Sequence, residues 1–107
     1  MEVYISDRAL HSMQCIYDLF YQWAGYRSAE HILNAIKNGY KQLALFPYTG
    51  PVESTLQAEN KHYRSLVIHS HYKIIYTIQG DRIYIMDIWD CRQDDKRMKE
   101  ILDNRID

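Results

Sequence analysis

The sequence predicts an α+β fold in which a helical hairpin packs against one face of a mainly antiparallel sheet. Between residues 6 and 46, apolar side chains recur with a helical period that is interrupted only once. Three later runs, Tyr63 to Ile68, Tyr72 to Ile78 and Arg82 to Trp89, are rich in β-branched and aromatic residues, as strands are. The chain of 107 residues is long enough for one core but not for two, so we expect a single domain over residues 1–107.

A short strand and a helix are predicted at the N-terminus. Residues Glu2 to Ile5 alternate polar and apolar side chains, which indicates a strand. Ser6 suits the N-cap of the following helix because its hydroxyl can accept a hydrogen bond from a free backbone N–H group. Gly25 suits the end of that helix. Its expected apolar stripe contains Met13, Ile16, Tyr17, Phe20, Trp23 and Ala24.

A second helix is predicted to start at Ser28 and to end near Phe46-Pro47, because the residue before a proline disfavours the α conformation. Its expected buried stripe consists of Ile32, Leu33, Ile36, Tyr40 and Leu43. The two helices then form a hairpin, after which the first strand can join the sheet beside the last one in parallel. The polar stretch Pro47 to Lys61 is expected to be a surface connection.

Turn signals set the expected register of the three later strands. Gly80-Asp81 is a two-residue hairpin signal, since glycine readily adopts the positive φ of a primed turn. The pairs that follow from it are Gln79 with Arg82, Lys73 with Ile88, and Thr77 with Tyr84. For the first hairpin we expect a His69-Ser70 turn, which pairs Ile68 with His71 and Arg64 with Ile75.

Because side chains alternate along a strand, these pairs predict two faces of the sheet. The expected core face carries Tyr63, Ser65, Val67, Tyr72, Ile74, Tyr76, Ile78, Ile83, Ile85 and Trp89. The expected second face carries Arg64, Leu66, Ile68, Lys73, Ile75, Thr77, Tyr84, Met86, Ile88, Asp90 and Arg92. An odd-numbered first turn would instead send Arg64 to the core face.

The apolar residues of the second face form a band that is too large to stay uncovered on a small monomer. One candidate cover is a short C-terminal helix, whose apolar stripe is Met98, Ile101 and Leu102. The other is a segment of a partner protein laid across the sheet. The two covers are compatible, because three apolar residues can cover only part of the band.

Composition narrows the classes of function. A formal net charge of −1 argues against a generally basic nucleic-acid-binding protein. Cys15 and Cys91 have no metal-ligand spacing, and we expect neither a metal nor another cofactor. The N-terminus lacks the pattern of a signal peptide, and no run of residues is apolar enough to span a membrane, so we expect a cytoplasmic location without membrane contact.

Four short motifs, in this order and spacing, resemble the RelE/ParE superfamily of bacterial toxins from type II toxin–antitoxin modules, which includes the plasmid stabilisation proteins. They are Phe46-Pro47-x-x-Gly50, Tyr63-Arg64-Ser65-Leu66-Val67, Tyr72-Lys73-Ile74-Ile75-Tyr76 and Asp90-Cys91-Arg92-Gln93. The resemblance covers nearly the whole chain. It implies a growth-inhibiting toxin and, as its partner, a cognate antitoxin that wraps and blocks the toxin. The toxin is then expected to contact operator DNA only through this antitoxin.

The resemblance also suggests residue roles. Arg64, Lys73 and Arg92 match positions at which the ribonuclease branch has cations. That branch cuts ribosome-bound mRNA without a metal, by attack of a 2′-hydroxyl on the neighbouring phosphate. Fixed guanidinium groups suit this chemistry, because negative charge builds up on the phosphoryl oxygens in the transition state. If the protein is an endoribonuclease of this kind, these three residues are its expected catalytic residues.

Several departures from the ribonuclease branch favour the ParE branch, whose members poison DNA gyrase. Leu66 stands where the ribonuclease branch commonly has a second cation, and the C-terminal segment offers no Tyr or His as acid or base. We therefore expect a gyrase inhibitor. The alternatives are a RelE-like endoribonuclease and a degenerate, non-toxic protein that only binds the antitoxin. In each case the expected binding face consists of Leu66, Ile68, Ile75, Tyr84, Met86 and Ile88.

Overall fold

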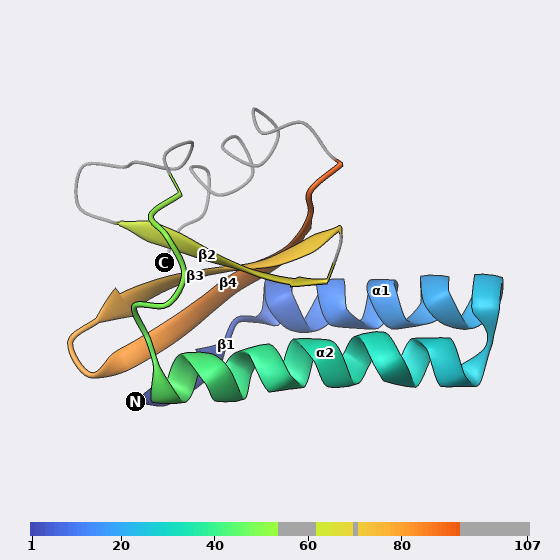
Figure 1. Cartoon of the computed structure of the whole chain (residues 1–107), viewed down its shortest axis with the longest axis horizontal. Coiled ribbons are helices and arrows are strands. Elements are labelled where there is room, and N and C mark those ends of the chain that lie inside the picture. Colours follow the sequence, from blue (N-terminus) through green and yellow to red (C-terminus); the bar gives the residue numbers. More distant parts are fainter. Residues whose placement is uncertain (54–61, 70, 93–107) are drawn as a thin grey trace.

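The computed structural model describes residues 1–53, 62–69 and 71–92 and contains six regular elements in these ranges (Figure 1). In chain order they are β1 (Glu2–Ile5), α1 (Asp7–Ala24), α2 (Tyr26–Leu45), β2 (Tyr63–His69), β3 (Tyr72–Gln79) and β4 (Arg82–Asp90). The predicted α+β class and order of elements are confirmed. The predicted C-terminal helix with Met98, Ile101 and Leu102 lies outside the described residues.

The strands form one sheet in the order β1-β4-β3-β2. β2, β3 and β4 make an antiparallel meander, and β1 pairs in parallel with β4 from Glu2↔Arg82 to Ile5↔Ile85, as predicted. β4 is longer than β1. Among the described residues, positions 86–90 of β4 therefore have no neighbouring strand on the β1 side.

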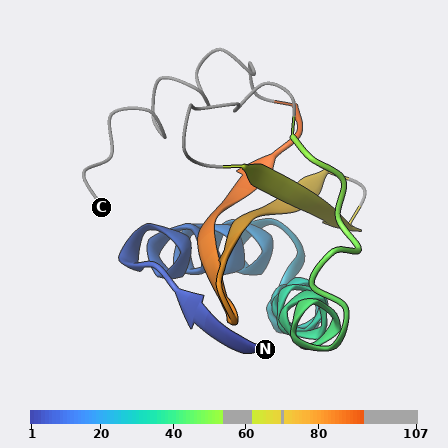
Figure 2. The same ribbon diagram turned by 90° about the vertical axis from the view of Figure 1, so that its left-hand side faces the viewer.

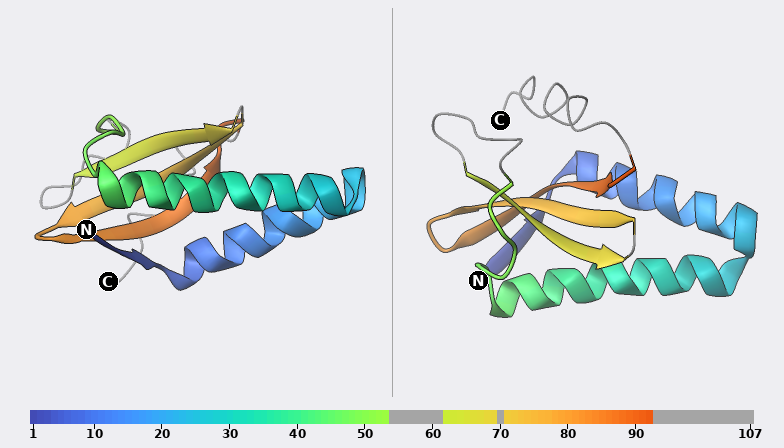
Figure 3. Two further views of the ribbon diagram at one scale, coloured as in Figure 1. Left: turned by 60° about the horizontal axis from the view of Figure 1, so that its bottom comes forward. Right: turned by 45° about the horizontal axis from the view of Figure 1, so that its top comes forward.

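Both helices lie on the same face of the sheet, as Figures 2 and 3 show. They run antiparallel and side by side, so the molecule has one helical layer and one sheet layer. Burial of apolar area between the two layers is the main driving force for this arrangement. No helix in the described part of the chain is long and apolar enough to cross a lipid bilayer.

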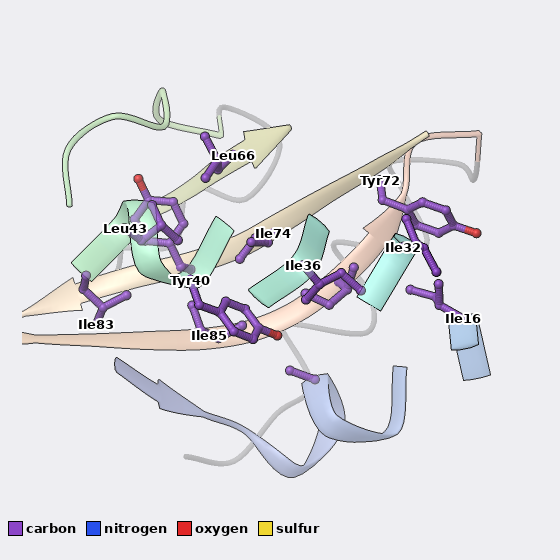
Figure 4. Close-up of a cluster of buried hydrophobic side chains, with 13 residues drawn as sticks. Ile16, Ile32, Ile36, Tyr40, Leu43, Leu66, Tyr72, Ile74, Ile83 and Ile85 are labelled. Carbon is purple, nitrogen blue, oxygen red and sulfur yellow. The ribbon is translucent and has the colours of Figure 1, made fainter. Parts of the chain in front are cut away.

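The main core lies between the helices and the sheet (Figure 4). From the helices it takes the predicted residues Ile16, Ile32, Ile36, Tyr40 and Leu43, together with Ala9. Phe20 and Met13 pack against it, also as predicted. Trp23, in contrast, was predicted to be buried and is 78% exposed, because α1 extends past the end of the sheet (Figure 1).

The helix boundaries follow from capping. The Ser6 hydroxyl accepts a hydrogen bond of 3.0 Å from Ala9 N, which confirms it as the N-cap of α1. Gly25 ends α1 but also begins α2, since its φ of 86° reverses the chain within one residue and its carbonyl accepts from Ala29 N. The predicted start at Ser28 was therefore wrong, and Ser28 lies inside the first turn of α2.

The β3–β4 hairpin has the predicted turn but a different register beyond it. Gln79↔Arg82 and Thr77↔Tyr84 are paired as predicted. The register then shifts at Met86, because a β-bulge places one extra residue in β4 between the pairs Tyr76↔Ile85 and Ile75↔Asp87. Lys73 consequently lies opposite Trp89, and the predicted pair Lys73–Ile88 was wrong.

The β2–β3 hairpin differs for a similar reason. Its turn lies one residue later than predicted, since His69 pairs with Tyr72. That difference alone would leave each side chain on its predicted face. A second bulge at Ile68 shifts the register back by one residue, so Arg64 lies opposite Tyr76 rather than Ile75.

The two bulges exchange several residues between the faces of the sheet. Leu66, Ile68 and Ile88, predicted on the second face, pack in the main core under the helices. Four residues predicted in the core instead lie on the second face: Tyr63, Ser65, Val67 and Trp89. There Tyr63 and Trp89 form a smaller buried cluster with Ile75 and Met86, and Tyr84 packs at its margin.

Candidate functional site

Arg64, the first predicted cation, supports the loop that follows α2. Its guanidinium donates a 2.8 Å hydrogen bond to the carbonyl of Gly50 and lies 5.1 Å from the ring centroid of Tyr48. The same loop pairs with the edge of β2, where Val52 forms a bridge with Arg64. Arg64 is therefore engaged within the molecule.

Tyr76 explains the Phe46-Pro47-x-x-Gly50 motif of this loop. Its hydroxyl donates to the carbonyl of Pro47 at 2.8 Å and accepts from Gly50 N at 3.0 Å, and burial raises the pKa of this phenol. A Cβ on Gly50 would collide with the backbone carbonyl oxygen of Ser65. Glycine is therefore required here for close approach of two backbone segments.

Lys73 points to the face of the sheet opposite the helices, because it pairs with Val67 and Trp89. Its Nζ lies 2.8 Å from a carboxylate oxygen of Glu53, and both side chains are largely shielded from solvent. This ion pair joins the second predicted cation to the loop after α2.

Arg92 lies just beyond β4 and binds Asp90 with two side-chain hydrogen bonds, Nε to Oδ1 at 3.0 Å and Nη2 to Oδ2 at 2.8 Å. The backbone N–H of Arg92 also donates to Asp90 Oδ1. These hydrogen bonds from Arg92 lower the pKa of the Asp90 carboxyl group.

The predicted grouping of Arg64, Lys73 and Arg92 on one face was wrong. Arg64 is opposite Tyr76 on the helical side, whereas Lys73 is opposite Trp89 on the other side. Arg92 follows the far end of β4, next to Tyr72 and Trp23. The register shift caused by the bulge at Ile68 separates Arg64 from Lys73.

Two tyrosines form an accessible pair on the second face. Tyr84, the one tyrosine that the sequence indicated as a contact residue, stacks on Tyr4 with ring centroids 5.5 Å apart. The Arg82 guanidinium lies 5.3 Å from the Tyr4 ring centroid. A pocket of about 400 Å³ next to the pair is also lined by Thr77 and Met86. Ile75 and Met86 themselves are buried.

Sequence reasoning missed a polar cluster between α1 and β4. The buried carboxylate of Asp87 accepts hydrogen bonds from Arg8 Nε at 3.0 Å, from the Ser12 hydroxyl at 2.5 Å, and from Ile88 N at 2.8 Å. A signal was present, since an Asp within an apolar strand needs partners and Arg8 and Ser12 share one face of a helix. The same carboxylate lies at the wall of a cleft of about 420 Å³.

The chain matches one protein family and resembles a solved structure in fold. The model of the family described as "ParE toxin of type II toxin-antitoxin system, parDE" matches residues 3–95 of the chain. Among solved structures, a chain of the chromosomal ParDE TA system from P. aeruginosa matches with a TM-score of 0.69 and 20% identity. That match covers 84% of this chain and 95% of the other. No curated protein sequence matches significantly.

Proposed function

Because the chain belongs to the ParE toxin family of type II toxin–antitoxin systems, we propose that it is a toxin that inhibits DNA gyrase and is neutralised by a cognate antitoxin. Membership of the family implies the antitoxin partner. The inhibition of gyrase is the more specific part of the proposal, and contact with operator DNA would occur through the antitoxin.

The observation that carries the proposal is the dispersal of the three cations. Metal-independent cleavage of RNA needs cationic groups that converge on one phosphate, where they stabilise the charge of the transition state. Here Arg64, Lys73 and Arg92 each contact a group of the protein, namely Gly50, Glu53 and Asp90. Arg64 and Lys73 also lie on opposite faces of the sheet. This arrangement favours a toxin that acts by binding.

The binding surface that we predicted from the sequence becomes smaller. Leu66 and Ile88 belong to the core, and Ile75 and Met86 are buried. Ile68 is only partly buried where it packs against the core, so the five residues together offer little contact surface in this structure. Tyr84 remains available together with Tyr4, and we propose this pair as a contact for gyrase or for the antitoxin.

The proposal is tested by producing the toxin without its antitoxin and following two activities of the purified protein. We expect inhibition of supercoiling by DNA gyrase, with an increase in cleaved DNA, and no degradation of mRNA on translating ribosomes. Addition of the antitoxin encoded next to the toxin gene should restore supercoiling. Cleaved mRNA with intact gyrase activity would support the RelE-like alternative, and the absence of both effects would support the degenerate, non-toxic alternative.

A further inference from the structure

The tyrosine pair Tyr4–Tyr84 lies on the face of the sheet opposite the helices. Val3 and Ile5 pack against the main core, so Tyr4 between them points to the other face, where it is 41% exposed. Tyr84 is the partner of Tyr4 in the register of β1 and β4. The two ring centroids are 5.5 Å apart and the ring planes differ by 23°, which is a stacked arrangement. The pair therefore presents a flat aromatic surface.

A pocket of about 400 Å³ adjoins this surface. The buried side chain of Met86 and the exposed side chain of Gln79 line it beside the two rings. A mostly apolar wall with a few polar groups is typical of pockets that bind small molecules, and the volume lies in their usual range. A planar ring in this pocket can stack on the tyrosines. The Gln79 amide, which is both a donor and an acceptor, is available to the polar edge of such a ring.

Arg82 adds a positive charge beside the rings. Its guanidinium lies 5.3 Å from the Tyr4 ring centroid, and it forms no ion pair within the described part of the chain. The three cations discussed above are each held by a group of the protein, whereas Arg82 is exposed. Along β4 it is two residues from Tyr84, or roughly 7 Å. An anion can therefore bind Arg82 while a ring attached to that anion stacks on Tyr84.

Glu2 opposes this charge. Its carboxylate accepts a 2.6 Å hydrogen bond from the Tyr4 hydroxyl, which holds the ring in place. Glu2 is also the partner of Arg82 in the register of β1 and β4. Glu2 therefore partly repels an anion that binds Arg82, and removal of the Glu2 charge should strengthen the binding of such an anion.

We propose that this site binds a purine nucleotide. The base stacks on the tyrosine pair, its polar edge contacts the Gln79 amide, and the phosphate binds the Arg82 guanidinium. A nucleotide fits because it carries a planar ring and an anion in one small molecule, joined by a sugar that spans the distance from Tyr84 to Arg82. A purine has a larger stacking area than a pyrimidine. Aromatic side chains on an open sheet face also stack bases in RNA-binding domains.

The inference goes beyond the proposed function, because it concerns a small ligand of the toxin itself. The tyrosine pair is also the contact that we proposed for gyrase or the antitoxin. A bound nucleotide would then compete with that contact.

The first test titrates the purified toxin with AMP and follows binding by NMR. We expect a Kd of roughly 1 mM or below. Tyr4→Ala should weaken binding at least roughly fivefold, because one stacking ring is lost, and Tyr4→Phe should stay within roughly twofold of wild type. Tyr26→Ala is the matched control, since Tyr26 is an exposed tyrosine of α2. Absence of binding up to about 10 mM AMP, or equal affinity of folded Tyr4→Ala and wild type, would overturn the proposal.

The second test locates the phosphate. Arg82→Gln should weaken the binding of AMP roughly fivefold and leave the binding of adenosine, which has no phosphate, unchanged. Glu2→Gln should strengthen the binding of AMP, while its amide oxygen can still accept from the Tyr4 hydroxyl. Arg27→Gln, at an exposed position of α2, is the control for the loss of a positive charge. Equal affinities of the wild type for AMP and adenosine would contradict a nucleotide site.

The third test separates a free nucleotide from a nucleic-acid strand. A single-stranded oligonucleotide of about eight deoxyadenylates should bind no more than roughly tenfold tighter than AMP, because the site holds one base. Much tighter binding that weakens steeply with salt would indicate a strand and rule out a free nucleotide as the ligand. These tests use neither gyrase nor the antitoxin. Intact gyrase activity in the presence of the toxin would therefore contradict the proposed function alone.

Discussion

Arg8 Nε on α1 lies 3.0 Å from Asp87 Oδ2 on β4, although the two residues are 79 positions apart in the sequence. With the Ser12 hydroxyl, this ion pair connects the first helix to the last strand. The Asp87 carboxylate is nearly inaccessible to solvent, so it depends on these partners to compensate for its lost hydration.

Removing either partner should destabilise the fold. We expect Arg8→Ala to lower the free energy of unfolding by about 1–2 kcal/mol, less than for a fully buried pair because the guanidinium is partly exposed. Asp87→Ala should have a similar or larger effect. Chemical denaturation of both single variants and the double variant gives the coupling energy, and strictly additive effects would contradict a direct interaction.

The Tyr76 hydroxyl should contribute measurably to stability. Tyr76→Phe leaves the buried Gly50 N–H without its acceptor, so we expect a loss of about 1–2 kcal/mol in the free energy of unfolding. Tyr48→Phe serves as the control, because Tyr48 is exposed and its ring still contacts Arg64. Equal stability of the two variants in urea denaturation would show that the Tyr76 hydroxyl is dispensable.

Gly39 should be sensitive to the smallest enlargement. A Cβ at this buried position of α2 would lie 2.6 Å from Ile74 Cδ1 and 2.7 Å from Ile68 Cγ2. The gain in helix propensity from Gly39→Ala, about 1 kcal/mol, is therefore opposed by crowding against the sheet, which typically costs 1–3 kcal/mol. We expect a net loss of thermal stability. A higher Tm than wild type would mean that Ile68 and Ile74 repack without strain.

Acid should weaken the contact between Asp90 and Arg92. The folded-state pKa of Asp90 lies below its ordinary value of 3.8, so this contact contributes stability above that pH and loses it as the pH falls through the folded pKa. We expect the Tm of the wild type to fall more between pH 5 and pH 2 than that of Asp90→Asn. An equal fall in the Tm of the two proteins over this pH range would show that the contact between Asp90 and Arg92 does not contribute to stability.

If the protein acts by binding rather than by phosphate chemistry, Lys73 should be dispensable for toxicity. The double variant Lys73→Met/Glu53→Gln removes both charges of the ion pair and so avoids leaving one of them unpaired. We expect it to arrest growth as the wild type does when produced without antitoxin. Loss of growth arrest in a variant that still folds would assign Lys73 a direct role.

The sequence by itself determined the α+β class, the order of elements, the Ser6 cap, the Gly80 turn and the resemblance to toxins of this family. These features depend on local signals, such as periodicity, capping side chains and turn residues, which act over a few neighbouring positions. The same signals placed Ile16, Ile32, Ile36, Tyr40 and Leu43 in the core correctly.

Only the tertiary structure decided which side chains share a face. A bulge adds a single residue to one strand, and the alternation of side chains then reverses for every position beyond it, so the bulges at Ile68 and Met86 moved Leu66 and Ile88 into the core. Neither bulge has a glycine or another local signature in the sequence. Local signals could not predict the partners of Arg64, Lys73 and Asp87 either. These partners, Gly50, Glu53 and Arg8, are distant in the sequence and come close only when the chain folds.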